Sequence, residues 1–160
     1  MVTVSSIAAR NATLDFDNLD GTRGYNPMKF YRQSKLANLL FAVDLQNRLE
    51  STGISTISVA CHPGISATNL LSRGSGKETW KIMKALMRIV AQPADKGALP
   101  TLYAATHPDL RGGEYIGPDG PGNHKGHPVL NNDVDRLYNP DLAARLWDVS
   151  ESLTGVKYGI

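Results

Sequence analysis

Short apolar segments alternate along the chain with longer segments of helical periodicity, and this alternation constrains the fold more than any other feature. Leucine and valine recur at steps of three and four residues over 28–52, which predicts a long helix that stops before Gly53. Buried strands are expected at residues 2–6, 55–61 and 114–117. Strands that alternate with helices form parallel βαβ units, so we expect an α/β domain whose three strands are parallel and adjacent.

Three further helices and two irregular stretches are expected around these strands. The helices are expected at residues 77–90, at 93–106 and from 139 onward. Residues 7–27, rich in Asn, Asp and Gly, and residues 118–128, rich in Gly and Pro, have no period and predict irregular structure. No linker or internal repeat divides the chain, so residues 1–160 are expected to form a single domain.

The composition excludes several classes of function. With 17 Lys and Arg against 15 Asp and Glu, the net charge is +2, too small to indicate a nucleic-acid partner. The single cysteine, Cys61, cannot form an intrachain disulfide, and no Cys/His spacing resembles a zinc site, so no metal is expected. No apolar run approaches the roughly 20 residues that span a bilayer, and the first residues lack the character of a signal peptide. We therefore expect a cytoplasmic protein without a membrane span.

The most informative cluster of polar residues lies at the start of the helix expected over 28–52. Tyr31 and Lys35 are four residues apart, so their polar ends share one face of that helix. An ammonium beside a phenol favours the phenolate, which allows the phenol to exchange a proton with an alcohol or carbonyl oxygen near neutral pH. Taken alone, such a pair is more often a solvated helix face, and its context decides between the two interpretations.

Polar residues also follow two of the expected strands. Ser5 and Ser6 end the first strand, and His62-Pro63-Gly64 follows the second. The carboxyl ends of parallel strands meet at one edge of a sheet, where such proteins build their sites. The pattern therefore predicts a site at that edge, to which three separate elements contribute polar groups.

Three motifs in this order resemble the short-chain dehydrogenase/reductase family. They are Val4-Ser5-Ser6 at a strand end, Tyr31-x-x-Ser34-Lys35 on the following helix, and Pro63-Gly64-x-x-x-Thr68 in the next turn. The wide spacing between Ser6 and Tyr31, together with His62-Pro63-Gly64, is most similar to the retinol-dehydrogenase-like and WW-domain-oxidoreductase-like branch. The resemblance covers essentially the whole chain, but only the C-terminal portion of the family fold.

The resemblance implies the C-terminal part of a doubly wound parallel Rossmann-type sheet, without the N-terminal nucleotide-binding half. The family begins with a glycine-rich turn between a strand and a helix that binds the cofactor pyrophosphate, and this chain has no such turn. We therefore expect residues 1–160 to be a partial family domain, whether a fragment, a chain with a misassigned start or a natural truncation. The chain alone is expected to bind no dinucleotide tightly and to be inactive.

For the full-length parent, the resemblance implies an oxidoreductase that interconverts an alcohol and a carbonyl on a small molecule with NADP or NAD, of which NADP is favoured. The implied catalytic residues are Ser6, Tyr31 and Lys35. Tyr31 is implied as the general acid/base, Ser6 as the partner of the substrate oxygen, and Lys35 as the group that holds the nicotinamide ribose. The implied cofactor-binding residues are Tyr31, Lys35, Pro63, Gly64, Ile65 and Thr68. Family members commonly dimerise through the helix with the Tyr-x-x-x-Lys pair, so a homo-oligomer is expected.

An alternative from another class stays open. The chain can instead be a truncated, non-catalytic interaction module, whose unpaired first strand binds another chain. Several residues also have structural interpretations. These are Ser5 as a structural hydroxyl, Ser34 as a helix-packing residue, Asn38 as a partner of nearby backbone, Cys61 as an inert packing thiol, and His62 as a residue that orders the Pro-Gly turn.

Overall fold

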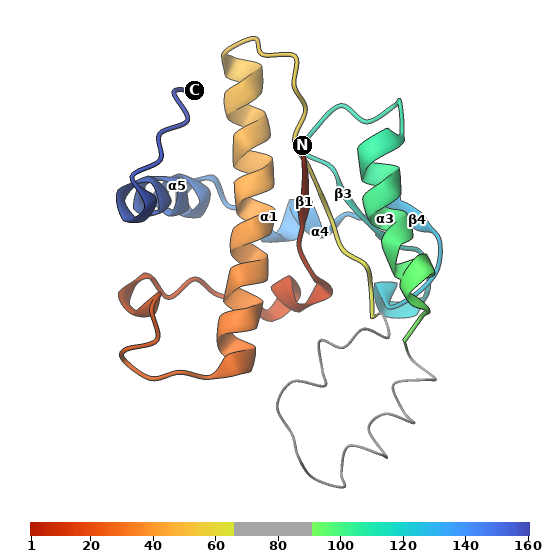
Figure 1. Ribbon diagram of the computed structural model, residues 1–160, viewed down its shortest axis with the longest axis horizontal. Helices are drawn as coiled ribbons and strands as arrows, with labels where there is room; N and C mark the ends of the chain where they lie inside the picture. The colour runs from red at the N-terminus through yellow and green to blue at the C-terminus, as the bar shows by residue number, and fades with distance from the viewer. Residues whose placement is uncertain (66–90) are drawn as a thin grey trace, which may run out of the picture.

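The strands of the sheet lie in the same order in space as along the chain. The computed structural model describes residues 1–65 and 91–160, and in them four strands form one sheet in the order β1-β2-β3-β4 (Figure 1). The strands are β1 (Val2–Val4), β2 (Val59–Cys61), β3 (Tyr115–Pro118) and β4 (Pro128–Leu130). β1 pairs with β2 and β2 with β3 in parallel, whereas β4 is antiparallel to β3. The expected parallel, adjacent arrangement of the first three strands is confirmed.

The fourth strand corrects the expectation of a three-stranded sheet. Residues 118–128 do contain an irregular turn, η4 (Pro121–Asn123), but Pro118 and Pro128 already pair across the hairpin. A strand of three residues that follows glycines and prolines shows no period, so the sequence pattern does not reveal it. β4 covers the outer edge of β3 that a three-stranded sheet leaves open. β1 and β2 are also shorter than expected, with three residues each.

The crossover between β1 and β2 is α1 (Pro27–Ser51), which matches the expected helix to within one residue at each end. Asn26 caps the start of the helix, and its side chain accepts a hydrogen bond from the Lys29 N–H at 3.0 Å. It stops before Gly53, which has a φ of 71° and so occupies the left-handed region that favours glycine. Local capping chemistry therefore fixes both ends of the helix that carries Tyr31 and Lys35.

The remaining helical elements surround this βαβ unit. They are α3 (Ala94–Thr106), α4 (Asp133–Leu137), α5 (Pro140–Thr154) and the 3-10 turns η1 (Ile7–Asn11) and η2 (Phe16–Asn18). The helices expected from residues 93 and 139 are thus confirmed, and the helix expected over 77–90 lies outside the described residues. None of the helices in the described parts of the chain is long and apolar enough to cross a membrane.

Helices lie on both faces of the sheet, with α1 on one side of the strands and α3 on the other (Figure 1). Successive side chains of a strand point to opposite faces, and β2 shows this directly. Ala60 packs with the α1 face, whereas Val59 and Cys61 pack with the α3 face. The residues buried with Ala60 are Leu39, Ala42, Val43 and Tyr115, and those buried with Val59 are Cys61, Ala104 and Ile116. The sheet is therefore the middle of three layers.

A second apolar side of α1 packs against α5. Ala143 of α5 is buried with Leu36 and Leu40, and Trp147 is buried with Leu45 and Leu49. α1 is thus buried between the sheet and α5, which holds the helix in a fixed position relative to the strand ends.

Candidate active site

The carboxyl ends of the parallel strands and the first turns of α1 lie at the same end of the molecule, the lower end in Figure 1. Each candidate residue that falls in the described parts of the chain belongs to one of these elements. Ser6 follows β1, Tyr31 and Lys35 lie in α1, and residues 63–65 follow β2. Thr68 lies outside the described residues. The topology therefore gathers the remaining predicted site residues at one edge of the sheet.

Tyr31 and Lys35 lie together on α1, as their spacing predicts. The Lys35 Nζ atom is 5.7 Å from the centroid of the Tyr31 ring, and both side chains are half-buried. At this distance the ammonium lies within cation–π range of the ring. The structure thus brings a phenol and an ammonium together on one face of α1. Ser34 is exposed rather than packed, and its hydroxyl donates to the Tyr31 carbonyl at 2.8 Å.

Ser6 caps the turn that follows β1. Its side-chain oxygen accepts a hydrogen bond from the Ala8 N–H at 3.2 Å, which places Ser6 at the N-cap of η1. The side chain is buried, and among the described residues the structure gives its O–H no acceptor. The hydroxyl oxygen is therefore held at the start of η1.

Two hydrogen bonds join α1 to the end of β1. The Ser5 hydroxyl donates to the Lys35 carbonyl at 2.6 Å, and the Asn38 side-chain amide donates to the Val4 carbonyl at 2.9 Å. Ser5 is buried, so the first bond is shielded from water. Both side chains have the structural role that the sequence indicates. Together the two bonds fix the helix turn that carries Lys35 against the strand end that carries Ser6.

The turn after β2 is held by backbone hydrogen bonds. The Ile65 N–H donates to the His124 carbonyl at 2.7 Å, and the Ile65 carbonyl accepts from the Gln92 N–H at 2.8 Å. Gly64 has a φ of 68°, and a Cβ at this position would lie 2.3 Å from the His124 carbonyl oxygen, so glycine is required. The Ile65 N–H is thus occupied, while its carbonyl oxygen has a second lone pair beyond the bond from Gln92.

Two residues that the sequence did not point to connect the strand ends. Gln92 donates from its side chain to the Pro63 carbonyl at 2.9 Å and accepts from the Gly126 N–H at 3.1 Å. Arg10 forms an ion pair with Asp133, with 2.6 Å between Nε and Oδ2, and also donates to the Gly122 carbonyl at 3.0 Å. The partners are far apart in the sequence, and no local pattern identifies such contacts.

His62 is completely buried beneath this turn. Burial and, to a smaller extent, the positive charge of Arg10 lower the pKa of His62 to about 4, so the imidazole is neutral at physiological pH. Burial also raises the pKa of the Cys61 thiol, which lies 3.4 Å from the Thr101 hydroxyl. Cys61 is therefore a protonated packing residue rather than a nucleophile.

The chain was compared with known proteins. It is 34% identical to human retinol dehydrogenase 14 over 98% of this chain and 44% of that protein, and 32% identical to human polyprenol dehydrogenase over 98% and 45%. It is 32% identical to the chloroplastic short-chain dehydrogenase TIC 32 A of Brassica napus over 96% and 46%. An uncharacterized protein from Mycobacterium Paratuberculosis has a crystal structure that matches with a TM-score of 0.75 and 34% identity, over 99% of this chain and 51% of that one. No protein-family model matches the chain.

The chain belongs to the short-chain dehydrogenase/reductase family. It spans a little under half the length of the curated relatives named above. Its sheet is the C-terminal portion of the family's Rossmann-type fold. The three named curated relatives are all called dehydrogenases.

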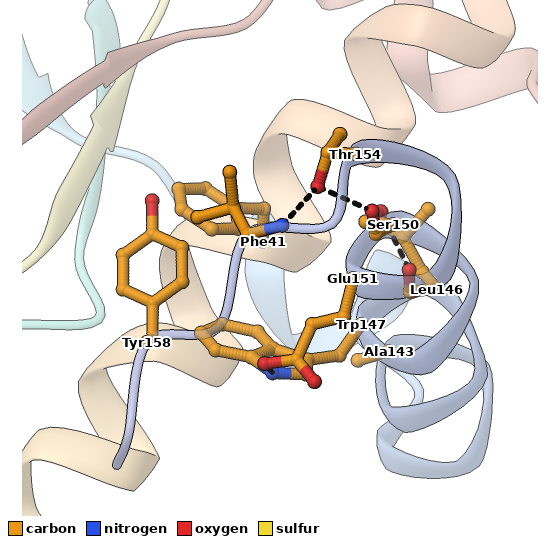
Figure 2. A pocket seen from close by; sticks show the side chains of 9 residues that line it. Phe41, Ala143, Leu146, Trp147, Ser150, Glu151, Thr154 and Tyr158 are labelled. Carbon is orange, nitrogen blue, oxygen red and sulfur yellow. Dashed lines mark hydrogen bonds between the residues drawn. The ribbon is translucent and has the colours of Figure 1, made fainter.

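This member of the short-chain dehydrogenase/reductase family also has a pocket away from the strand ends, between α1, α5 and the C-terminal residues (Figure 2). Phe41 stacks on Trp147 with 5.7 Å between ring centroids, and Tyr158 lies 5.2 Å from Trp147. The hydrogen bonds drawn in Figure 2 join Leu146, Ser150 and Thr154 along α5, and join Thr154 to Val156, which follows the helix. None of the predicted catalytic residues lines this pocket. We call it the aromatic pocket below.

Proposed function

We propose that the protein to which this chain belongs interconverts an alcohol and a carbonyl on a small molecule, with NADP or NAD as the cofactor. The observation that carries the proposal is the Tyr31–Lys35 pair, with 5.7 Å from Nζ to the ring centroid, on a helix that is bonded to the end of β1. A phenol beside an ammonium has the composition needed to exchange a proton with an alcohol or carbonyl oxygen.

The residues of this chain divide the work between them. Tyr31 gives a proton to the carbonyl oxygen or takes one from the alcohol, and Lys35 stabilises the phenolate that remains. Ser6 accepts from the Ala8 N–H and donates its O–H to the same substrate oxygen. The hydrogen bond from Ser5 to the Lys35 carbonyl holds α1, with Tyr31 and Lys35, against the strand end that carries Ser6.

The chain offers residues for one end of the cofactor. Lys35 and the turn at residues 63–65 lie at the strand ends, where they would hold the nicotinamide riboside part; the cofactor, when bound, supplies the hydride. The glycine-rich turn that holds a pyrophosphate does not occur in the sequence. The chain therefore has residues that would hold the nicotinamide end of the cofactor, but it has no glycine-rich turn for the cofactor phosphates.

The test compares the 160-residue chain with the same chain extended at its N-terminus by the nucleotide-binding half of a family member, called the extended chain below. NADH and NADPH are titrated into both by fluorescence and calorimetry, and both are assayed on a panel of aldehydes. We expect the extended chain to bind one cofactor and reduce members of the panel, and the 160-residue chain to do neither. An extended chain that binds either cofactor but reduces no aldehyde would contradict the proposal. Micromolar binding of NADH or NADPH by the 160-residue chain would show that this chain holds the cofactor without the N-terminal half.

A further inference from the structure

Arg10 lies on η1, the same 3-10 turn that Ser6 begins. The Ala9 N–H donates to the Ser6 carbonyl at 3.0 Å, which closes the turn. Ala9 is fully buried and packs with Leu36 and Leu40 of α1. Arg10 follows at the end of the turn, with 23% of its side chain exposed. Ala9 therefore anchors η1 on α1, and the next residue connects the same turn to the β3–β4 side of the sheet.

The Arg10 guanidinium donates from all three of its nitrogens. Nε pairs with Asp133 Oδ2 at 2.6 Å, Nη1 donates to the Gly122 carbonyl at 3.0 Å, and Nη2 donates to Asn123 Oδ1 at 2.5 Å. Only 12% of the Asp133 side chain is exposed, so the ion pair is shielded from most of the solvent. A guanidinium presents its donors in a rigid, planar fork, whereas a lysine at this position supplies the charge without the fork. The three partners therefore require an arginine.

Asn123 belongs to the loop of the β3–β4 hairpin and has an unusual backbone conformation. Its φ is 57°, in the left-handed region that asparagine tolerates better than most residues. Its side chain is held on both sides, because Oδ1 accepts from Arg10 and the amide donates to the Pro118 carbonyl at 2.6 Å. Its N–H donates to the Gly120 carbonyl at 2.8 Å. The bond from Arg10 thus stabilises one particular path of the hairpin loop.

The same hairpin loop holds the turn that follows β2. His124, the next residue of the loop, accepts at its carbonyl from the Ile65 N–H at 2.7 Å. The Gly126 N–H donates to the side chain of Gln92 at 3.1 Å, and the Gln92 amide donates to the Pro63 carbonyl at 2.9 Å. The hairpin loop is therefore bonded to η1 on one side and to the turn after β2 on the other.

We propose that Arg10 is a positioning residue that couples the two parts of the site at the strand ends: Ser6 at the start of η1, and the turn at residues 63–65. The inference rests on the proposed function, in which Ser6 contacts the substrate oxygen and the turn holds the nicotinamide end of the cofactor. Arg10 acts through the hairpin loop, so a change at this position displaces both parts together. A displacement of about 1 Å costs about 100-fold in rate, and partial loss of the fork is expected to cost about tenfold.

The first measurement reads both parts of the site in the 160-residue chain by amide hydrogen exchange. The reporters are the Ala8 N–H, which donates to the Ser6 hydroxyl, and the Ile65 N–H, which donates to the His124 carbonyl. Arg10→Lys keeps the charge and loses the fork. We expect both reporters to exchange about tenfold faster in this variant, as the loss of about one hydrogen bond predicts. Acceleration of only one reporter, or of neither, would overturn the proposal.

A third amide separates this effect from a general loss of stability. The Gly113 N–H donates to the Ser58 carbonyl at 2.7 Å, at the amino ends of β2 and β3. We expect its exchange rate in Arg10→Lys to stay within about threefold of the wild-type rate. Equal acceleration of all three amides would make Arg10 a general stabilising contact and would contradict a positioning role.

Arg48 provides a matched control. Its Nε pairs with Asp44 Oδ2 at 2.8 Å, and the exposed fractions of the two side chains, 29% and 11%, are close to the 23% and 12% of the Arg10 pair. Both partners lie on α1, so this pair joins no distant segments. Arg48→Lys is expected to leave both reporters within about threefold of their wild-type exchange rates. The same tenfold acceleration in Arg48→Lys would show that the effect is not specific to Arg10.

A second variant breaks the link from the side of the hairpin. Asn123→Gly keeps the left-handed backbone, which glycine adopts readily, and removes the Oδ1 acceptor. We expect it to accelerate both reporters, and the double variant with Arg10→Lys to exchange within about twofold of the faster single variant, because the two changes remove one shared contact. Additive acceleration would show that the two residues act independently and would contradict the route through the hairpin.

Kinetics of the extended chain test the positioning role itself. Arg10→Lys should lower kcat about tenfold and raise the KM for the cofactor about tenfold, whereas Arg48→Lys should stay within about twofold of the parent. In a Ser6→Ala background, Arg10→Lys should lower kcat by less than about threefold more, because Arg10 acts on kcat through Ser6. A full further tenfold loss of kcat in that background would overturn this role.

Failure of this inference differs from failure of the proposed function. If the exchange results hold but the extended chain reduces no aldehyde, the proposed function fails and the coupling of η1 to the turn stands. If the extended chain is active and Arg10→Lys matches the parent in kcat and KM, this inference alone fails.

Discussion

The strand-end site and the aromatic pocket are built on opposite principles, although α1 contributes to both. At the strand ends, single hydrogen bonds join segments that are distant in the sequence, such as Ser5 to the Lys35 carbonyl. In the aromatic pocket, rings from α1, α5 and the C-terminal residues pack against one another, and the hydroxyls of Ser150 and Thr154 bond to carbonyls four residues before them. The comparison teaches that packing of apolar area stabilises α5 on α1, whereas the geometry of the site depends on a few polar bonds.

The largest expected effect on stability is at the aromatic pocket. Trp147 is buried, stacks on Phe41 and lies under the Arg48 guanidinium, which is 4.1 Å from its ring. Trp147→Ala should lower the free energy of unfolding by about 3–5 kcal/mol, measured by urea titration. Leu153→Ala, at an exposed position of the same helix, is the control and should change it by less than about 0.5 kcal/mol. A decrease in the free energy of unfolding of less than about 1 kcal/mol in Trp147→Ala would contradict the claim that packing of apolar area stabilises α5 on α1.

A fall in pH should instead lower the free energy of unfolding through His62, at the strand ends. The pKa of His62 is about 4 in the folded protein and about 6.5 when unfolded. The unfolded chain therefore takes up a proton first, and the contribution of His62 is complete above pH 6.5 and is lost as the pH falls from 6.5 to about 4. The loss amounts to about 3 kcal/mol. His62→Asn lacks this titration, so the wild type should lose that much more stability than the variant over the same range. Parallel pH curves for the two proteins would contradict the prediction.

A matched pair of serines sharpens the comparison with a smaller effect. The Ser5 and Ser150 hydroxyls both donate to a carbonyl at 2.6 Å, but Ser5 is buried and reaches α1, whereas Ser150 is exposed and bonds within α5. Ser5→Ala removes a buried hydrogen bond between the end of β1 and α1 and should cost about 1 kcal/mol. Ser150→Ala leaves a carbonyl that water can reach and should cost less than about 0.5 kcal/mol. Equal losses would show that burial does not distinguish the two bonds.

The same contrast explains how much could be predicted from the sequence. The long helix, the parallel strands and the Tyr31–Lys35 pair follow from period, capping and i,i+4 spacing, which are local properties. β4 is too short to show a period, and its pairing depends on the hairpin at residues 118–128. The contacts of Arg10 with Asp133 and of Gln92 with Pro63 join residues that come together only in the fold, so no spacing reveals them.

The central claim is that Tyr31 carries the proton transfer at the strand ends, and turnover by the extended chain tests it most directly. Tyr31→Phe removes one hydroxyl and should lower kcat by about 10²–10⁴-fold, while circular dichroism shows an unchanged fold. Tyr158→Phe makes the same chemical change at the aromatic pocket and should stay within about twofold of the parent. Near-normal turnover in Tyr31→Phe would contradict the account.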